Sequence, residues 1–549
     1  MRPEFKDSMD WLHTWSGVIL GAVMFAIFWM GTLSVFKDET DQWFWPYARD
    51  AAPAQIVSAD AILDTARAHF SEHDLDRLVL AMPTDRAPAP SIIAFTEKGS
   101  MMPVYLDQHT LQITGELDSG AASYFFYPFH YQLNIGHSGR WIVGLTSMFL
   151  LLGLFSGIII HKKIFVDFFT FRAAKKLPRK SLDLHNMTSV FAMPFHLMIT
   201  ITGVLIFATF YLEASLKGIY GQTDGVRAQV ANEVQSFYAE QPDDQTVHLG
   251  IASLDAMIIR AQREWGPGFT VKEIYIDHLS RADGTVRIRA NIDHRIDDYT
   301  QPITFDKVSG EMLTEPWISS AGYTQAFIRG MHEIHFDHTL LRWLYVAGGI
   351  AGCIMIATGY IYWLESRRRK HSRQGGYGLP VVEALTIWGV MGMLSATAAY
   401  FFANRVLPGG QWEFLGILKI FWEVIIFYLV YLLALVHGGL RKKKAWFDQA
   451  VLIAFLCFGA AVANWITTGD HLILTVSTGH WAIAGIDLSL LVCCAVSAYA
   501  AHRLRANWAI EAETARSKST NRSTVTDSQK EQAPHPVASV AAEEKVAAE

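Results

Sequence analysis

The sequence predicts a polytopic α-helical membrane protein that carries two soluble α+β inserts, and three observations support this fold class. Hydrophobic residues make up 51% of the 549-residue chain, a high share for a soluble protein. Eight stretches contain the roughly 20 apolar residues that a helix needs to cross a bilayer. Basic clusters follow every second stretch, and two histidine-containing segments recur at fixed offsets later in the chain.

The eight apolar stretches set the order of elements along the chain. The first four alternate with two long polar segments, whereas the last four follow one another closely. Their approximate ranges are 14–36, 140–160, 187–210, 341–363, 381–403, 414–437, 446–467 and 481–501. We therefore expect a first group of four membrane helices with two inserts, followed by a second group of four helices.

The distribution of basic residues predicts the orientation of these helices. Arg2 and Lys6 precede the first helix, and a basic cluster follows each even-numbered helix. Lysine and arginine are enriched in cytoplasmic loops, so both termini are expected in the cytoplasm. The clusters are Lys162, Lys163, Arg172, Lys175, Lys176, Arg179 and Lys180; Arg367, Arg368, Arg369 and Lys370; Arg441, Lys442, Lys443 and Lys444; and Arg503 and Arg505.

Two inserts, 37–129 and 211–331, are then expected on the opposite side of the membrane. In each, a short helical segment is followed by alternating β-prone residues and by an aspartate with a glycine-containing turn. Each insert is therefore predicted to be a small α+β domain. The helices are expected near 58–70 and 252–264, and the turns at Asp107 to Gly115 and at Asp306 to Gly310.

The remaining composition excludes some alternatives. The four cysteines lie in apolar stretches without a CxxC spacing, which argues against a disulfide framework or an Fe–S site. No cleavable signal peptide is evident, because the first apolar run is too long and no small-residue cleavage site follows it. The segment from about 508 onward is polar, rich in alanine and without periodicity, so a disordered tail is expected there.

The repeated segments carry histidines. With an offset of 172 positions His13 matches His185, and with an offset of 202 positions His130 matches His332. The same two offsets match Gly31 with Gly203, Gly157 with Gly359, and Arg140-Trp141 with Arg342-Trp343. A duplicated unit can place equivalent histidines opposite each other across a pseudo-twofold axis. Paired imidazoles are good axial ligands for haem iron.

This ordered set of features resembles the PepSY-associated transmembrane helix family over about residues 8–366. The resemblance rests on the Leu-His starts of helices one and three, the glycines near their far ends, the Asp…Gly-Glu ends of the inserts, and the His…Arg-Trp…(Ser/Thr)-Gly pattern of helices two and four. Members are similar to bacterial inner-membrane ferric-siderophore reductases. These hold two b-type haems between four helices and carry two periplasmic PepSY domains.

The resemblance implies a duplicated TM–PepSY–TM core of four helices with two periplasmic α+β domains, to which this chain adds four C-terminal helices. Two departures stand out. Asp107 and Gly115 are spaced more widely than Asp306 and Gly310, so the first turn is expected to be built differently, and helices five to eight lie outside the resemblance. The implied segments are 1–36 (N-terminus and first helix), 37–129 (PepSY-like domain 1), 130–210 (helices two and three), 211–331 (PepSY-like domain 2), 332–366 (helix four), 380–503 (helices five to eight) and 508–549 (cytoplasmic tail).

The predicted topology places the candidate haem ligands at two depths. His137 and His161 are 24 residues apart, roughly 36 Å along a helix, so they cannot serve one haem. His185 and His196 are 11 residues apart, about three helical turns, so they are expected to project from the same face about 16 Å apart, which suits two haems stacked across the bilayer. The candidates are His13, His161 and His185 at the cytoplasmic edge; His130, His137, His332, His335 and His338 at the opposite edge; and His196 inside the third helix.

Two ligand assignments remain open. Repeat symmetry pairs His13 with His185 at one site and His130 with His332 at the other, as axial ligands of the haem irons. Depth gives a competing assignment, because His130 precedes the second helix by ten residues. In that case the outer haem would be held by His196, His137, His335 or His338, although the repeat mate of His196 is only Met24. For His161, capping of a helix end explains the residue as well as ligation does.

Other residues near these histidines also allow two interpretations. Arg140 and Arg342 either snorkel to the membrane surface or pair with haem propionates. The four repeated glycines allow close packing of helices or close approach of a porphyrin. The aromatic runs 43–47 and 124–127 are either interfacial belt residues or a docking surface for a bulky chelate.

These observations and the resemblance lead to one leading hypothesis and two rivals. The leading hypothesis is an inner-membrane electron-transfer protein with two haem b groups that reduces periplasmic ferric siderophores or other ferric chelates for iron acquisition. No G-x-G-x-x-G or Walker motif is present, so electrons must come from an external quinol or cytoplasmic reductase. The rivals are a non-enzymatic module that binds or regulates a periplasmic protein, and a transporter with Glu423 as the only candidate intramembrane carboxylate of the last four helices. No nucleic-acid partner is expected.

Overall fold

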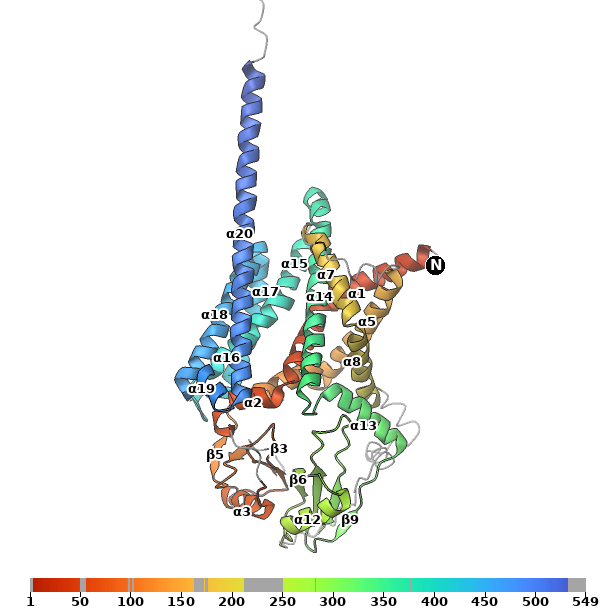
Figure 1. Ribbon diagram of the computed structural model, residues 1–549, viewed down its shortest axis with the longest axis vertical. Coiled ribbons are helices and arrows are strands. Elements are labelled where there is room, and N and C mark those ends of the chain that lie inside the picture. Colours follow the sequence, from red (N-terminus) through yellow and green to blue (C-terminus); the bar gives the residue numbers. More distant parts are fainter. Residues whose placement is uncertain are drawn as a thin grey trace, which may run out of the picture.

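The computed structural model in Figure 1 consists of a group of long helices and a β-sheet part below it. It describes residues 3–49, 56–96, 99–100, 103–161, 172, 176–211, 250–281, 283–374 and 378–531. Several predicted features lie outside these residues. They are Arg2 before the first helix, Lys162, Lys163 and Lys175 of the basic link, the first part of the second insert up to 249, and the end of the tail from 532.

Seven helices of the described part are long and apolar enough to cross a membrane, and a bent pair makes an eighth candidate. Their positions agree with the eight predicted stretches, so the prediction of a polytopic helical membrane protein in a lipid bilayer is confirmed. The spans are α1 (Pro3–Ser34), α5 (His137–Ile160), the pair α7 (Leu177–Phe191) and α8 (Met193–Ile206), α14 (Thr339–Gln374), α15 (Gly378–Ile387) with the π-helix η3 (Trp388–Gly392) and α16 (Met393–Val406), α17 (Lys419–Arg441), α18 (Lys443–Thr468) and α20 (Trp481–Glu531).

The third predicted span is bent rather than straight. α7 and α8 meet near Ala192 at an angle of 66°. Pro194, in the first turn of α8, has no backbone N–H, so the hydrogen-bond ladder is interrupted at this point. The expectation that His185 and His196 project from one face of a straight helix is therefore wrong.

The strands of the two inserts form one nine-stranded sheet instead of two separate domains. Strand β1 of the first insert pairs antiparallel with β6 of the second, with Leu78 opposite Ile276. This pairing covers a strand edge that each insert would otherwise expose. The order is β5-β4-β2-β1-β6-β7-β8-β9, with β3 on β2; the bounds are β1 (Arg77–Ala81), β2 (Ser91–Thr96), β3 (Gly99–Ser100), β4 (Val104–Leu106), β5 (Ile113–Glu116), β6 (Val271–Asp277), β7 (Thr285–Ala290), β8 (Ile303–Asp306) and β9 (Met312–Thr314).

The two short helices of the inserts, α3 (Ala59–His69) and α12 (Leu254–Trp265), cap each other reciprocally. The Asp255 carboxylate accepts hydrogen bonds from the Ala59 N–H at 2.8 Å and from the hydroxyl of the preceding serine. The Asp60 carboxylate accepts the equivalent bonds from the Leu254 N–H at 2.7 Å and from Ser253. Each aspartate thus satisfies the free N–H groups of the other helix, and the two inserts are related by an approximate twofold.

The turns that end the two inserts are built alike, contrary to the expectation from their different spacing. The carboxylate of Asp107 accepts from the N–H groups of the second and third residues after it, and that of Asp306 does the same. The fourth residue has a positive φ in both turns: 69° at Gly310 and 56° at Leu111. Leu111 therefore occupies the left-handed position that glycine fills in the second insert, and Gly115 lies in β5.

Short helices connect the sheet to the membrane helices. They are α2 (Lys37–Phe44), the 3-10 helix η1 (Pro46–Ala48), the π-helix η2 (Ala121–Phe126), α4 (Tyr127–Gln132) and α13 (Ser320–Glu333); α9 (Ala208–Tyr211), α19 (Leu472–Ser477) and the strands β10 (Glu413–Phe414) and β11 (Ile417–Leu418) complete the described elements. Trp43 and Phe44 are fully buried against α16. The aromatic run 43–47 is thus mainly core, and neither interpretation made from the sequence holds for Trp43 and Phe44.

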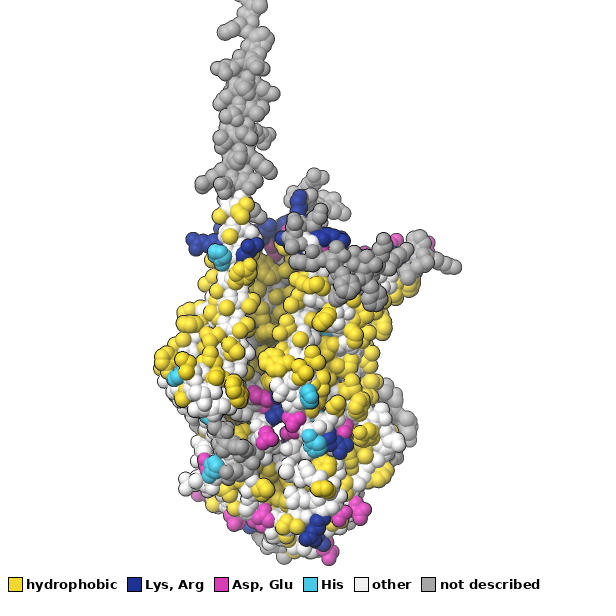
Figure 2. Space-filling view, in the orientation of Figure 1, with side chains coloured by type: hydrophobic (Ala, Val, Ile, Leu, Met, Phe, Trp, Pro, Cys, Tyr) yellow, Lys and Arg dark blue, Asp and Glu magenta, His cyan; other side chains and the backbone are white. Residues whose placement is uncertain are grey.

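The surface of the molecule is divided in the way that a membrane protein requires. Figure 2 shows hydrophobic side chains over the middle of the helical part, with lysine and arginine gathered at the end remote from the sheet. At that end α20 continues as helix to Glu531, so the prediction of a disordered tail from 508 is wrong as far as 531. A helix that grows from a membrane-embedded segment needs no new nucleus, and alanine, glutamate and lysine support its extension.

Candidate functional site

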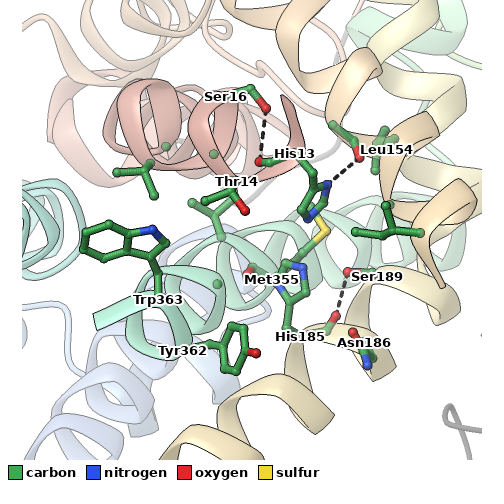
Figure 3. Close-up of a pocket in the computed structure, with 18 of the residues that line it drawn as sticks. His13, Thr14, Ser16, Leu154, His185, Asn186, Ser189, Met355, Tyr362 and Trp363 are labelled. Atoms are coloured by element: carbon green, nitrogen blue, oxygen red, sulfur yellow. Dashed lines mark hydrogen bonds between the residues drawn. The ribbon is translucent and has the colours of Figure 1, made fainter. Parts of the chain in front are cut away.

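His13 on α1 and His185 on α7 face each other, with ring centroids 6.1 Å apart (Figure 3). We call them the far-side pair, because the N-terminal part of α1, which carries His13, lies at the end of the helices remote from the sheet (Figure 1). Nδ1 of His13 lies 2.9 Å from the carbonyl oxygen of Gly153 on α5, and Nδ1 of His185 lies 2.8 Å from that of Met355 on α14. A carbonyl oxygen only accepts, so each Nδ1 carries the hydrogen. The Nε2 atoms of the neutral rings therefore keep a free lone pair.

A cavity of about 390 Å³ surrounds the far-side pair between α1, α5, α7 and α14. This volume lies within the range of about 300–1,000 Å³ that is typical of cofactor and ligand pockets. Apolar residues such as Met24, Leu150 and Met355 line its interior. His161 ends α5 and also borders the cavity, so it lies beside the pair but is not one of its two facing rings.

His130 on α4 and His332 on α13 form a second pair, with ring centroids 6.0 Å apart; we call it the sheet-side pair. Nδ1 of His130 lies 2.9 Å from the carbonyl oxygen of Ile27. Nδ1 of His332 lies 3.0 Å from the Thr202 hydroxyl, and the backbone of Ile199 also interacts with the His332 ring. Burial lowers the pKa of both rings, to about 3 for His332, where the neighbouring His130 lowers it further. The neutral rings again leave Nε2 free.

The residues that contact the two histidine pairs are themselves related by the repeat offsets. Ile27 and Ile199, whose backbones contact the two rings of the sheet-side pair, are 172 positions apart, and Gly153 and Met355, which accept from the far-side pair, are 202 apart. The four repeated glycines each lie against one of the four imidazoles. Their role is therefore to make room for the rings, which neither interpretation made from the sequence included. The contacts are Gly31 with His130, Gly203 with His332, Gly157 with His13 and Gly359 with His185.

Alanine at Gly203 is expected to disturb the sheet-side pair more than alanine at Gly359 disturbs the far-side pair. A Cβ at Gly203 would lie 2.8 Å from Cε1 of His332, so the ring must move, whereas at Gly359 the nearest atom of His185 is 3.2 Å away. We expect about 10- to 100-fold weaker cofactor binding at the sheet-side pair of Gly203→Ala, and at most a few-fold change for Gly359→Ala. Cofactor titration of the purified variants measures this. Gly439→Ala, on α17 away from both pairs and with open space at its Cβ, is the matched control, and equal binding in all three variants would contradict the contact.

The competing candidates do not form such pairs in the described part of the chain. Nε2 of His196 donates to the carbonyl of Gly348 at 3.1 Å, and its Nδ1 is buried. Nε2 of His137 accepts from the Trp141 indole at 3.4 Å. Nδ1 of His338 accepts from a backbone N–H at the start of α14, and both ring nitrogens of His335 are buried beside Phe336. Geometry therefore favours the assignment by repeat symmetry.

The two arginines of the repeat have partners within the protein. The buried guanidinium of Arg342 lies 2.7 Å from the Glu39 carboxylate and 4.0 Å above the Phe36 ring centroid. Arg140 donates to the side-chain oxygen of Gln132 at 3.2 Å. In this structure an internal carboxylate neutralises the charge of Arg342, and its pairing with a cofactor carboxylate stays a prediction.

Each pair presents two nitrogen donors with the spacing of axial ligands. Two metal–imidazole bonds of about 2 Å place the ring centres about 6 Å apart, as observed in both pairs. Within the described residues no group of three or more His, Cys, Asp or Glu side chains could hold a metal ion. Each pair thus offers two imidazole donors, one from each side of the space between the rings.

Comparison with known proteins identifies the family. A family model described as the PepSY-associated TM region matches residues 11–366, which is more than half of the chain. The chain belongs to this family. The matched region contains both histidine pairs and ends within α14, so α15 to α20 lie outside it. The chain is also 23% identical over 399 residues, 66% of this chain and 90% of the relative, to the Pseudomonas aeruginosa protein named "Uncharacterized protein PA4219".

The helices beyond the PepSY-associated TM region contain buried charges that the sequence analysis missed. Glu423 is fully buried on α17, as expected for an intramembrane carboxylate. Asp487 on α20 and Glu383 on α15 are also buried, so the expectation that Glu423 stands alone in these helices is wrong. Both residues lie within predicted apolar stretches, and a search of each stretch for single charges would have found them.

Proposed function

We propose that this protein is a bacterial inner-membrane electron-transfer protein that binds two haem b groups and reduces ferric chelates in the periplasm. One observation carries the proposal: two pairs of imidazoles, each with ring centroids about 6 Å apart, leave Nε2 free, because Nδ1 is hydrogen-bonded to a backbone carbonyl or, in His332, to the Thr202 hydroxyl. A hydrogen bond from Nδ1 fixes the tautomer and orients the ring for ligation through Nε2. The duplicated TM–PepSY–TM layout implied by the family accounts for the twofold relation.

The residues present fit haem at both places. His13 and His185 would hold one group and His130 and His332 the other, with the four glycines leaving room for the ligand rings. When bound, each haem supplies a one-electron carrier whose potential the protein tunes. Along α1, His13 and Gly31, which touches His130, are 18 residues apart, or about 27 Å. The two pairs therefore lie near opposite sides of a bilayer core of about 30 Å.

The basic clusters support the orientation. They gather at the end of the helices remote from the sheet, and lysine and arginine are enriched in cytoplasmic loops, which supports a cytoplasmic location for both termini and a periplasmic one for the sheet. The reaction moves one electron from an external donor, a quinol or a cytoplasmic reductase, to the Fe(III) of a chelate such as a ferric siderophore. The resulting Fe(II) is held weakly by hard oxygen ligands, so reduction releases the iron.

Mixing the reduced protein with a ferric chelate tests this function. We expect the protein, reduced without oxygen in lipid nanodiscs, to be reoxidised by a ferric hydroxamate, with one Fe(II) captured by an Fe(II)-specific dye per electron lost. The matched control is the gallium(III) complex of the same hydroxamate, which has the same shape and charge but accepts no electron. A protein that stays reduced in both mixtures would refute the reductase function while leaving haem binding intact.

A further inference from the structure

The two helices that carry the sheet-side histidines are repeat mates and pack on equivalent helices, α4 on α1 and α13 on α8, but α4 has additional neighbours. α13, with His332, packs on α8, and its Tyr323 and Phe327 side chains are 45% and 42% exposed. α4, with His130, continues directly from η2, and Phe125 of η2 packs against the C-terminal helices. The Phe125 ring stacks on Tyr400 of α16 at 4.6 Å and meets the edge of Phe427 of α17 at 4.9 Å.

Polar contacts fasten the residues just before η2 to the same helices. The Ser119 hydroxyl donates to the Glu423 carboxylate at 2.5 Å, and the other oxygen of that carboxylate accepts from Asn404 of α16 at 2.8 Å. The adjacent Asp118 carboxylate lies 2.9 Å from the Lys419 ammonium group. Ser119 and Glu423 are fully buried, so no water can replace their hydrogen bond.

A second set of contacts holds the first turn of η2. The Asp41 carboxylate of α2 accepts from the N–H groups of Ala122 at 2.8 Å and Ser123 at 3.0 Å, and also from the Ser123 hydroxyl. α2 is itself attached to α20, because the Trp43 indole donates to Asp487 at 2.8 Å. Both sides of η2 are therefore connected to helices beyond the family region.

We propose that the C-terminal helices α15 to α20 serve to position His130, with Glu423 as the positioning residue that holds the Ser119–η2–α4 segment. This inference rests on the proposed function, because the sheet-side pair matters only if it holds a redox group. It gives the four added spans a role within the same electron path. His332 lies on the repeat mate α13, which packs on α8 as α4 packs on α1, and within the described residues α13 makes no comparable contact with α15 to α20.

Hydrogen exchange tests the support without any cofactor. In haem-free Glu423→Ala protein we expect amides of residues 118–132 to exchange about tenfold faster than in the unmodified protein. Glu423→Gln should restore slow exchange, because its amide can still bond to Ser119 and Asn404. Glu383→Ala removes another buried carboxylate of the same unit, 3.0 Å from Arg368, and should leave 118–132 unchanged. Unchanged exchange in folded Glu423→Ala would overturn the proposal.

A second measurement connects the support to the redox site. In the haem-loaded protein, Glu423→Ala should shift the potential and the electron paramagnetic resonance signal of the sheet-side haem and leave those of the far-side haem unchanged, with Gln restoring the original values. Equal shifts at both haems would overturn the positioning role. If Glu423→Ala does not fold, Ser119→Ala replaces it, with a smaller increase in exchange expected. Because the exchange experiment needs no haem, failure of the proposed function and failure of this inference are distinguishable.

Discussion

The His332→Ala protein is expected to hold one haem per chain and to lose reduction of ferric chelates. The substitution removes one of the two Nε2 donors of the sheet-side pair, and the described residues that surround it offer no third donor that faces His130. Since loss of an outer-shell partner alone weakens metal binding about 10- to 100-fold, loss of a ligand should weaken it by more than about 100-fold. Haem content and Fe(II) release by the purified variant measure both effects.

His335→Ala and His338→Ala are the matched controls for this prediction. Both histidines lie within six residues of His332, but the His335 ring lies against Phe336 and Nδ1 of His338 accepts from the Leu341 N–H. These variants should keep two haems per chain and full chelate reduction. If His335→Ala or His338→Ala loses the sheet-side haem while His332→Ala retains it, the competing assignment by depth is correct and the symmetric one is wrong.

The His185→Ala protein is expected to lose the other haem and to become unable to accept electrons from a cytoplasmic-side donor. His185 supplies one Nε2 donor of the far-side pair, and its removal leaves only His13 facing the cavity centre, with His161 at the border. In inverted membrane vesicles, a quinol or cytoplasmic reductase should no longer reduce the remaining haem. A membrane-permeant chemical reductant should still do so, because the sheet-side pair is intact.

His161→Ala distinguishes ligation from proximity at the same cavity. It borders the cavity but is not part of the facing pair, so its removal should leave both haems in place and reduction by the donor within a few-fold of the unmodified protein. Retention of the far-side haem in His185→Ala together with its loss in His161→Ala would show that the ligands are assigned wrongly.

The repeat made the histidine pairing predictable from the sequence. Two residues at equivalent positions of a duplicated unit lie at equal distances from the twofold axis, so they meet if they lie close to it. His13 with His185 and His130 with His332 satisfy this condition in the structure. His196 does not, because its mate is Met24, and it bonds across to α14 instead. Whether the pairs hold haem stays a prediction.

Other features depended on contacts that no local pattern encodes. The β1–β6 pairing joins residues almost 200 positions apart, and alternation within a strand does not specify its partner. Arg342 resembles an interfacial arginine by its position, yet its charge is neutralised by Glu39, about 300 positions earlier. Tryptophan is a residue type that is enriched in membrane belts, but Trp43 is completely buried. It packs against the C-terminal helices, which lie outside the family pattern. Tertiary context decided each of these cases.

The haem content and redox difference spectrum of the purified full-length protein test the central claim most directly. The account predicts two b-type haems per chain, both six-coordinate with two histidines, which His185→Ala and His332→Ala each reduce to one. A purified, folded protein that binds no haem when expressed with an ample haem supply, or that keeps two haems in both variants, would contradict it.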